Sequence, residues 1–272
     1  MKNISVKAIG AAVLIGCMFL TGCLQMQLES SDAQMRMDAL SQVPSEKLAY
    51  IVWNVPLSYS SLKPYRHCHW QRRGSPETAQ YPDDIRVAAI DRMYNEGMIT
   101  QLCEIAEDCM RGPALALTSD EVFIRKSITA KFMTLEGFTV LANQAKASSD
   151  GSDIRSLYHS VLYQSDDSLI KIIAQRPELI IDDYCERTLV EKASDTQTML
   201  VIVTNRTYSS QTRITAAKKL FKHGNVAGEQ ILAALGAFDD LGENELTMLA
   251  EEGLKAAKRI GATDVVQALE GE

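Results

Sequence analysis

The sequence predicts an all-α fold made of stacked helix pairs. From residue 83 onward, apolar side chains recur at helical spacing, as at Ile85, Ala89 and Met93. Acidic or hydroxyl residues precede many of these segments and glycines follow several of them, which is typical of helix caps. Five of the seven prolines lie within 44–82. The sequence therefore predicts a largely irregular segment followed by a helical domain.

The expected helices follow one another to the end of the sequence. A short helix at 45–53 is compatible with the proline-rich stretch. Gly224, Gly242 and Gly261 are interpreted as stops, and the apolar triplet at 201–203 as buried helix. The other expected helices are 85–97, 98–108, 119–147, 154–164, 166–175, 178–191, 195–204, 209–223, 226–238, 243–260 and 263–270.

Some of these segments resemble one another. Residues 85–97 align without gaps on residues 212–224, which pairs Arg86 with Arg213. Further partial matches give offsets close to multiples of about 42 residues. The arginine, the alanines after it, a large apolar pair and a glycine resemble the first helix of a HEAT-like repeat. The resemblance implies a right-handed solenoid of helix pairs, and an irregular helical bundle is the alternative.

The first 23 residues have the features of a targeting segment. Lys2 and Lys7 precede an apolar run of about 13 residues, which is too short to span a hydrocarbon layer as a helix. The run ends in Leu-Thr-Gly-Cys at 20–23, which resembles the lipobox of bacterial lipoproteins. A second match ending at Cys17 leaves a much shorter apolar core, so Cys23 is the expected lipidated residue.

The lipoprotein resemblance implies a cellular location and a lipid anchor. Residues 1–22 would be a cleaved signal peptide, and acyl chains on Cys23 would hold the chain to a bilayer. Leu24 and Gln25 stand where an aspartate would retain such a protein in the inner membrane. We therefore expect attachment to the outer membrane, with the chain facing the periplasm.

Four cysteines follow Cys23, and an oxidising compartment favours disulfides between them. Cys103 and Cys109 would lie about 9 Å apart along an unbroken helix, which is too far for a bridge. Cys68 is therefore expected to bond one of them, and Cys185 is a candidate for a buried free thiol. All three connectivities of Cys68, Cys103, Cys109 and Cys185 remain open at this point.

Charge separates a possible binding segment from the rest of the chain. The expected organisation is a lipidated tether at 23–42, a proline-, aromatic- and base-rich segment at 43–82, and a helical domain at 83–272. Between Glu46 and Glu77 there are five lysines and arginines and no acid, although the net charge of the chain is −7. This segment could bind an anionic lipid or glycan, or it could pack on acidic helices. The binding candidates are Trp53, Tyr65, Arg66, Trp70, Arg72 and Arg73.

The sequence contains none of the common catalytic motifs. The serine-hydrolase elbow, the zincin helix and the glycine-rich phosphate loops are missing. His67, Cys68 and His69 lack a convincing further ligand, so no metal, cofactor or catalytic residue is expected. Acidic pairs such as the one at 182–183 lie where carboxylates cap helices. The acidic balance argues against nucleic-acid binding.

These observations favour a non-enzymatic binding or scaffold protein of an envelope assembly. Its partner would be an envelope protein or peptide that binds along the helical surface. Two alternatives remain. One is an enzyme acting on cell-wall material through His67 or His69 and a distant carboxylate. The other is a binder of anionic lipid or glycan that uses the segment at 43–82.

Overall fold

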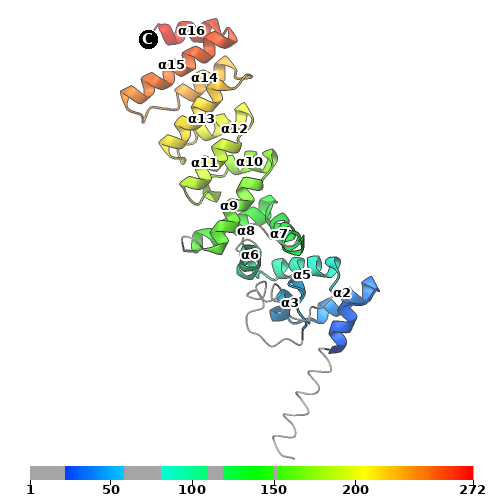
Figure 1. Ribbon diagram of the computed structural model, residues 1–272. Coiled ribbons are helices and arrows are strands. Elements are labelled where there is room, and N and C mark those ends of the chain that lie inside the picture. Colours follow the sequence, from blue (N-terminus) through cyan, green and yellow to red (C-terminus); the bar gives the residue numbers. More distant parts are fainter. Residues whose placement is uncertain (1–21, 58–80, 109–118, 150–151, 272) are drawn as a thin grey trace, which may run out of the picture. The chain divides into compact units, whose positions relative to one another are not determined.

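The computed structural model describes residues 22–57, 81–108, 119–149 and 152–271 (Figure 1). These residues are mostly helical and include no strand, which confirms the all-α prediction. They form two compact units. Unit 1 comprises the described parts of Met1–Phe132 and Gly151–Leu157, and unit 2 those of Met133–Asp150 and Tyr158–Glu272.

The stretch predicted as a lipidated tether, residues 23–42, is mostly helical and forms part of unit 1. Its second half is α2 (Ala33–Gln42), which begins where the Asp32 carboxylate accepts hydrogen bonds from two backbone N–H groups. Leu40 is buried, and Arg92 donates to its carbonyl oxygen at 2.7 Å. The capping aspartate and the apolar contacts make this stretch part of a folded unit rather than a linker.

The remaining helices of unit 1 pack around α5, which contacts α2, α3, α6 and α7. The predicted short helix at 45–53 is present as a 3-10 turn followed by α3. Ile85 and Met93 of α5 are completely buried, as the helical spacing predicts. The bounds are Ser45–Lys47 for the 3-10 turn, Leu48–Val52 for α3, Asp83–Asn95 for α5, Ile99–Asp108 for α6 and Ser119–Phe132 for α7.

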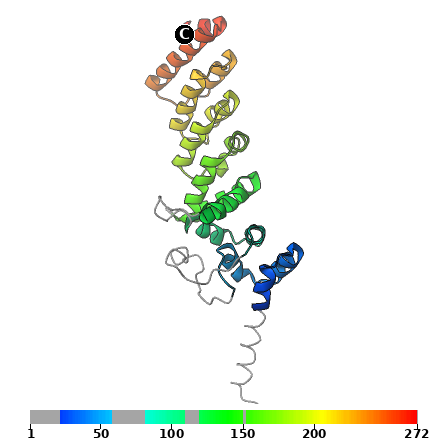
Figure 2. The ribbon, with the colours of Figure 1, turned by 45° about the vertical axis from the view of Figure 1, so that its right-hand side comes forward.

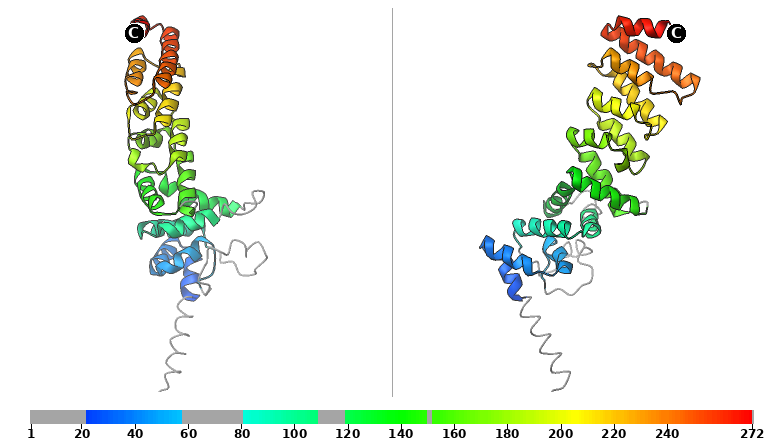
Figure 3. Two further views of the ribbon diagram at one scale, coloured as in Figure 1. Left: turned by 90° about the vertical axis from the view of Figure 1, so that its left-hand side faces the viewer. Right: turned by 180° about the vertical axis from the view of Figure 1, so that it is seen from behind.

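Unit 2 is a two-row stack of helices. In one row α10 contacts α12, α12 contacts α14 and α14 contacts α16, while α11, α13 and α15 follow one another in the other row. Figures 2 and 3 show this stacking from α10 to α16. α9 (Asp153–Gln164) belongs to this unit from Tyr158 onward. The other bounds are Leu135–Ala147 for α8, Asp167–Ala174 for α10, Pro177–Leu179 for a 3-10 turn, Asp183–Lys192 for α11, Thr196–Thr204 for α12, Ser210–Lys222 for α13, Gly228–Leu235 for α14, Glu243–Ile260 for α15 and Thr263–Glu270 for α16.

Two of the sequence predictions about helix ends need correction. The helix expected at 119–147 is divided into α7 and α8, because the Thr134 hydroxyl accepts a hydrogen bond from the N–H of Gly137 and starts a new helix. Gly242 precedes the start of α15 rather than ending a helix. Gly261 does end α15, with the positive φ of 73° that glycine accommodates best.

The predicted repeat length is also wrong for the stack. Helices α9, α11, α13 and α15 begin 30, 27 and 33 residues apart, which is shorter than the expected unit of about 42 residues. The shorter spacing arises because the helices are short and their connections are only a few residues long. A spacing near 42 residues therefore does not describe how consecutive helix pairs stack in unit 2.

The sequence alignment of Arg86 with Arg213 nevertheless identifies two side chains in equivalent environments. Both side chains are almost fully buried, with 2% and 1% of their surface exposed. Each Nε donates at 3.0 Å to a valine carbonyl, Val52 at the end of α3 for Arg86 and Val203 of α12 for Arg213. Each guanidinium also lies over a phenylalanine ring. An arginine thus fixes α5 to α3 and α13 to α12 through the same kinds of contact.

None of the described helices is both long enough and apolar enough to cross a membrane. The longest, α15, is an 18-residue helix with four acidic and three basic side chains in its sequence. Its Leu249, Gly253 and Ala256 are buried, so α15 is an amphipathic helix of the stack.

Candidate functional site

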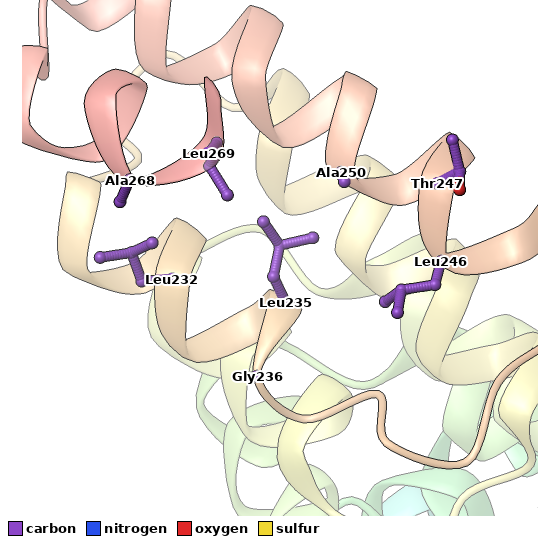
Figure 4. Close-up of a pocket in the computed structure, with 8 residues that line it drawn as sticks. All are labelled: Leu232, Leu235, Gly236, Leu246, Thr247, Ala250, Ala268 and Leu269. Atoms are coloured by element: carbon purple, nitrogen blue, oxygen red, sulfur yellow. The ribbon is translucent and has the colours of Figure 1, made fainter. Parts of the chain in front are cut away.

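An apolar groove lies among α14, α15 and α16 of unit 2 (Figure 4). Its volume is about 460 Å³. Leu232 and Leu246 are 41% and 38% exposed, so two large aliphatic side chains of the lining stay partly uncovered. In Figure 4 the side chains of Leu232, Leu235 and Leu269 point into the space between the helices. The lining residues are Leu232, Leu235, Gly236, Leu246, Thr247, Ala250, Ala268 and Leu269.

The groove exists because α14 has apolar residues on two faces. Ile231 and Ala234 are buried in the stack, while Leu232 projects from another side of the same short helix. α15 approaches α14 closely at Gly253, where an added Cβ would lie 3.0 Å from the Leu235 side chain. The close contact fixes one wall, and α16 closes the other side without covering the exposed leucines.

The surroundings of the groove are acidic. Residues 226–271 contain nine acidic and three basic residues. All three bases already have partners: Lys255 pairs with Glu252 at 3.1 Å, Lys258 pairs with Glu270 at 2.6 Å, and Arg259 donates to a backbone carbonyl. Two further acids, Asp239 and Asp240, pair with Arg206 and Arg213 outside this range. An excess of negative charge remains at the other acids, which are Glu229, Glu243, Glu245, Glu251 and Asp264. It favours a positively charged ligand.

The predicted binding residue Trp53 lies elsewhere and is a core residue. It is 3% exposed in unit 1, together with the buried Tyr50 and Tyr81. This burial contradicts the prediction of an exposed interface side chain and agrees with the alternative that aromatics of this segment pack on the helices. The other candidates lie outside the described residues; they are Tyr65, Arg66, Trp70, Arg72 and Arg73, and the histidines at 67 and 69 do as well.

The cysteines differ in their surroundings. Cys23, the predicted lipidation site, is exposed. Cys103 is buried, but the predicted bridge from Cys68 to Cys103 or Cys109 involves residues outside the described part of the chain. Cys185 is a buried free thiol, which is the alternative that the sequence allowed, so it is not a disulfide partner.

A second group of polar side chains surrounds Cys185. His159 of α9 places Nε2 3.0 Å from Oδ2 of Asp182, and the other carboxylate oxygen of Asp182 accepts a hydrogen bond from the Cys185 N–H at 3.0 Å. One potential metal-ligand atom from each of the three residues lies within 4.8 Å of the other two. The sequence places Asp182 at a helix start, but it does not indicate that His159 comes close to it.

The pKa values in this group reflect burial and hydrogen bonding. Burial raises the pKa of the Cys185 thiol far above its ordinary value, and the neighbouring Asp182 carboxylate raises it further. Partial burial works against ionisation of Asp182, but hydrogen bonds from Cys185 and His159 outweigh it and lower the pKa of this carboxyl group. At neutral pH the group therefore contains a carboxylate beside a protonated thiol.

The groove and the polar group can support different kinds of chemistry. Of the eight residues that line the groove, only Thr247 has a polar side chain, so the groove is suited to binding an apolar surface. The polar group combines nitrogen, oxygen and sulfur donors. No family model, curated protein or solved structure matches this chain.

Proposed function

We propose that this chain is a non-enzymatic docking protein whose C-terminal groove binds an amphipathic, basic helix of a protein partner. The observation that carries the proposal is the open apolar groove in a strongly acidic part of the surface. A groove between helices suits the apolar face of a further helix, whose side chains at positions i, i+3 or i+4, and i+7 would occupy it. Basic residues on the flanks of that helix would face the surplus acids.

The energetics favour such a ligand. Covering Leu232 and Leu246 removes exposed aliphatic surface from water, and fully burying a leucine side chain is worth about 1.5–3 kcal/mol. Glu243 and Glu245 lie in the first turn of α15; Glu243 is one turn before Leu246 and Thr247 of the groove wall, and Glu245 directly precedes Leu246. Charges at the edge of an apolar contact mainly accelerate association and select partners. The groove would thus provide affinity and the acids would provide selectivity.

We also propose that the chain acts at the cell envelope, attached to the outer membrane through lipid on Cys23 and facing the periplasm. The Leu-Thr-Gly-Cys motif supports the anchor, and the exposure of Cys23 and Met26 leaves this end of unit 1 accessible. A partner in an envelope assembly would then be recruited to the membrane by the groove. The mechanism is complementarity of shape and charge, without bond chemistry.

A designed peptide tests the groove directly. We expect the chain to bind a fluorescent helical peptide made only of leucine and lysine, with leucines on one face, as measured by fluorescence anisotropy. Leu246→Glu should weaken binding at least about tenfold, because it puts a charge into the apolar wall and loses more than about 1.4 kcal/mol. Ile172→Glu is the matched control, because Ile172 is 37% exposed on α10, outside the groove. It should bind like the wild type.

Three results would overturn this function. Equal binding of a peptide in which glutamate replaces every lysine would show that the acidic surroundings do not select the ligand. Unchanged binding by a folded Leu246→Glu variant would show that the groove is not the site. Sedimentation velocity provides a third readout, because a dimer that Leu246→Glu dissociates would mean that a second copy of the chain fills the groove.

A further inference from the structure

We infer that His159, Asp182 and Cys185 form a binding site for a zinc ion in unit 2, with water as the fourth ligand. The site is separate from the groove, which involves none of these residues. Two segments provide the ligands: His159 comes from α9, and the other two come from the start of α11. The inference does not depend on the proposed docking function.

The positions of the ligand atoms suit a small tetrahedral ion. Zinc bonds of about 2.0–2.3 Å at tetrahedral angles separate ligand atoms by about 3.3–3.8 Å. In this cluster Nε2 of His159 and Oδ2 of Asp182 are 3.0 Å apart, and all three ligand atoms lie within 4.8 Å of one another. Shifts of about an ångström or less in each side chain would bring the atoms to bonding positions.

The backbone already fixes two of the ligands. Asp182 is the N-cap of α11, and its Oδ1 accepts the N–H of Cys185, which leaves Oδ2 directed toward His159. Because the cap residue and the third residue of a helix lie on the same side of its first turn, the carboxylate and the thiol sulfur converge. Such an outer hydrogen bond to a ligating carboxylate is a usual feature of metal sites.

The donor set selects the metal. A thiolate, an imidazole and a carboxylate together favour zinc, whereas magnesium and calcium prefer oxygen ligands only. Three protein ligands leave one tetrahedral position for water. The side chains of His159 and Asp182 are 29% and 28% exposed, so an ion and its water can enter from solvent, while Cys185 closes the inner side.

Binding of an ion would also balance the charge of its ligands. The buried Cys185 sulfur lies near the Asp182 carboxylate, so a cation bound by both groups would offset the negative charge of a ligating thiolate and carboxylate. A divalent ion provides the compensating positive charge when it displaces the thiol proton to solvent. The ring of Tyr184 lies 4.6 Å from the imidazole ring of His159, and this contact restricts the orientation of the imidazole.

Cobalt(II) titration of the full chain under reducing conditions tests the site. Cobalt takes the place of zinc and is the probe, because a thiolate ligand gives a near-ultraviolet charge-transfer band and a tetrahedral site gives intense visible bands. We expect one equivalent to produce both bands and zinc to remove them. Cys185→Ser should lose the charge-transfer band, and Cys103→Ser, which changes another buried cysteine, should keep it.

The Asp182→Asn variant tests the loss of a metal ligand without disturbing the start of α11. Asparagine is an equally good N-cap, so α11 should remain intact, but the loss of the negative ligand should weaken cobalt binding at least about tenfold. The matched control is Asp166→Asn, since Asp166 caps α10 in the same way at 2.8 Å and lies outside the cluster. It should bind cobalt like the wild type. The inference is wrong if no thiolate band forms, if the band survives Cys185→Ser, or if Asp182→Asn binds as tightly as Asp166→Asn.

Discussion

Replacing Arg213 by methionine is expected to lower the free energy of unfolding of unit 2 by about 2–4 kcal/mol. The guanidinium is 1% exposed and donates to the carbonyl oxygens of Val203 and Ala237. Methionine fills much of the volume but donates no hydrogen bond, so both carbonyl groups lose a partner in a buried location. It also removes the contact with the Phe238 ring, whose centroid lies 4.9 Å from the guanidinium carbon.

Urea unfolding followed by circular dichroism measures this effect. Arg213→Lys should lie between the methionine variant and the wild type, because a lysine keeps the charge but cannot donate to several carbonyls at fixed angles. The matched control is Arg206→Met, which removes an arginine that is 65% exposed and paired with Asp239 on the surface. It should change stability by less than about 0.5 kcal/mol.

Hydrogen exchange shows which of the two units loses stability in each variant. Arg213→Met should accelerate exchange in α12 and α13 and leave α3 and α5 unchanged, whereas Arg86→Met should do the reverse. The equivalence of the two arginines would be refuted if either variant unfolded at the wild-type urea concentration. It would also be refuted if both variants changed the same helices.

The change Cys23→Ser is expected to move the protein from the membrane fraction to the soluble fraction of cells that secrete it. A serine has no thiol to acylate, and no described helix can replace the lipid as an anchor. Fractionation with immunoblotting measures the shift, and metabolic labelling with a radioactive fatty acid should lose its signal in the same variant. The leader should also remain uncleaved or be cleaved elsewhere.

Cys17 provides the control for that experiment. It ends the second, weaker match to the motif, so Cys17→Ser should be processed, labelled and sedimented like the wild type. If Cys23→Ser were still processed and still sedimented with membranes, the proposed anchor and the proposed location at the outer membrane would both be wrong.

Much of the fold could be predicted because helix patterns are local. The ends of α15 and α16 match their predicted ranges, 243–260 and 263–270, since a glycine or a polar cap marks them in the sequence. The alignment of Arg86 with Arg213 also identified two side chains in matching environments. The break at Thr134 was missed because the apolar pattern continues across it, and a hydroxyl cap inside a helical pattern is a weak signal.

The candidate sites could not be predicted in the same way, because they depend on contacts between distant residues. Trp53 was selected by residue type, which cannot distinguish an interface aromatic from a core aromatic, and the structure shows it in the core. In the sequence, Leu232 and Leu246 each lie among apolar residues at helical spacing, as ordinary core residues do. Only the arrangement of α14, α15 and α16 shows that their side chains remain partly uncovered. His159 is 23 residues from Asp182, and no local pattern joins them.

Photocrosslinking in intact cells is the most direct test of the docking function. A photoreactive phenylalanine analogue at Leu246 should give a specific adduct with one protein, and the crosslinked peptide should be an amphipathic helix with basic flanks. The same analogue at Ile172, which is similarly exposed outside the groove, should not give that adduct. Equal adducts from both positions, or an adduct at Leu246 with a second copy of this chain, would contradict the assignment of the groove to a partner helix.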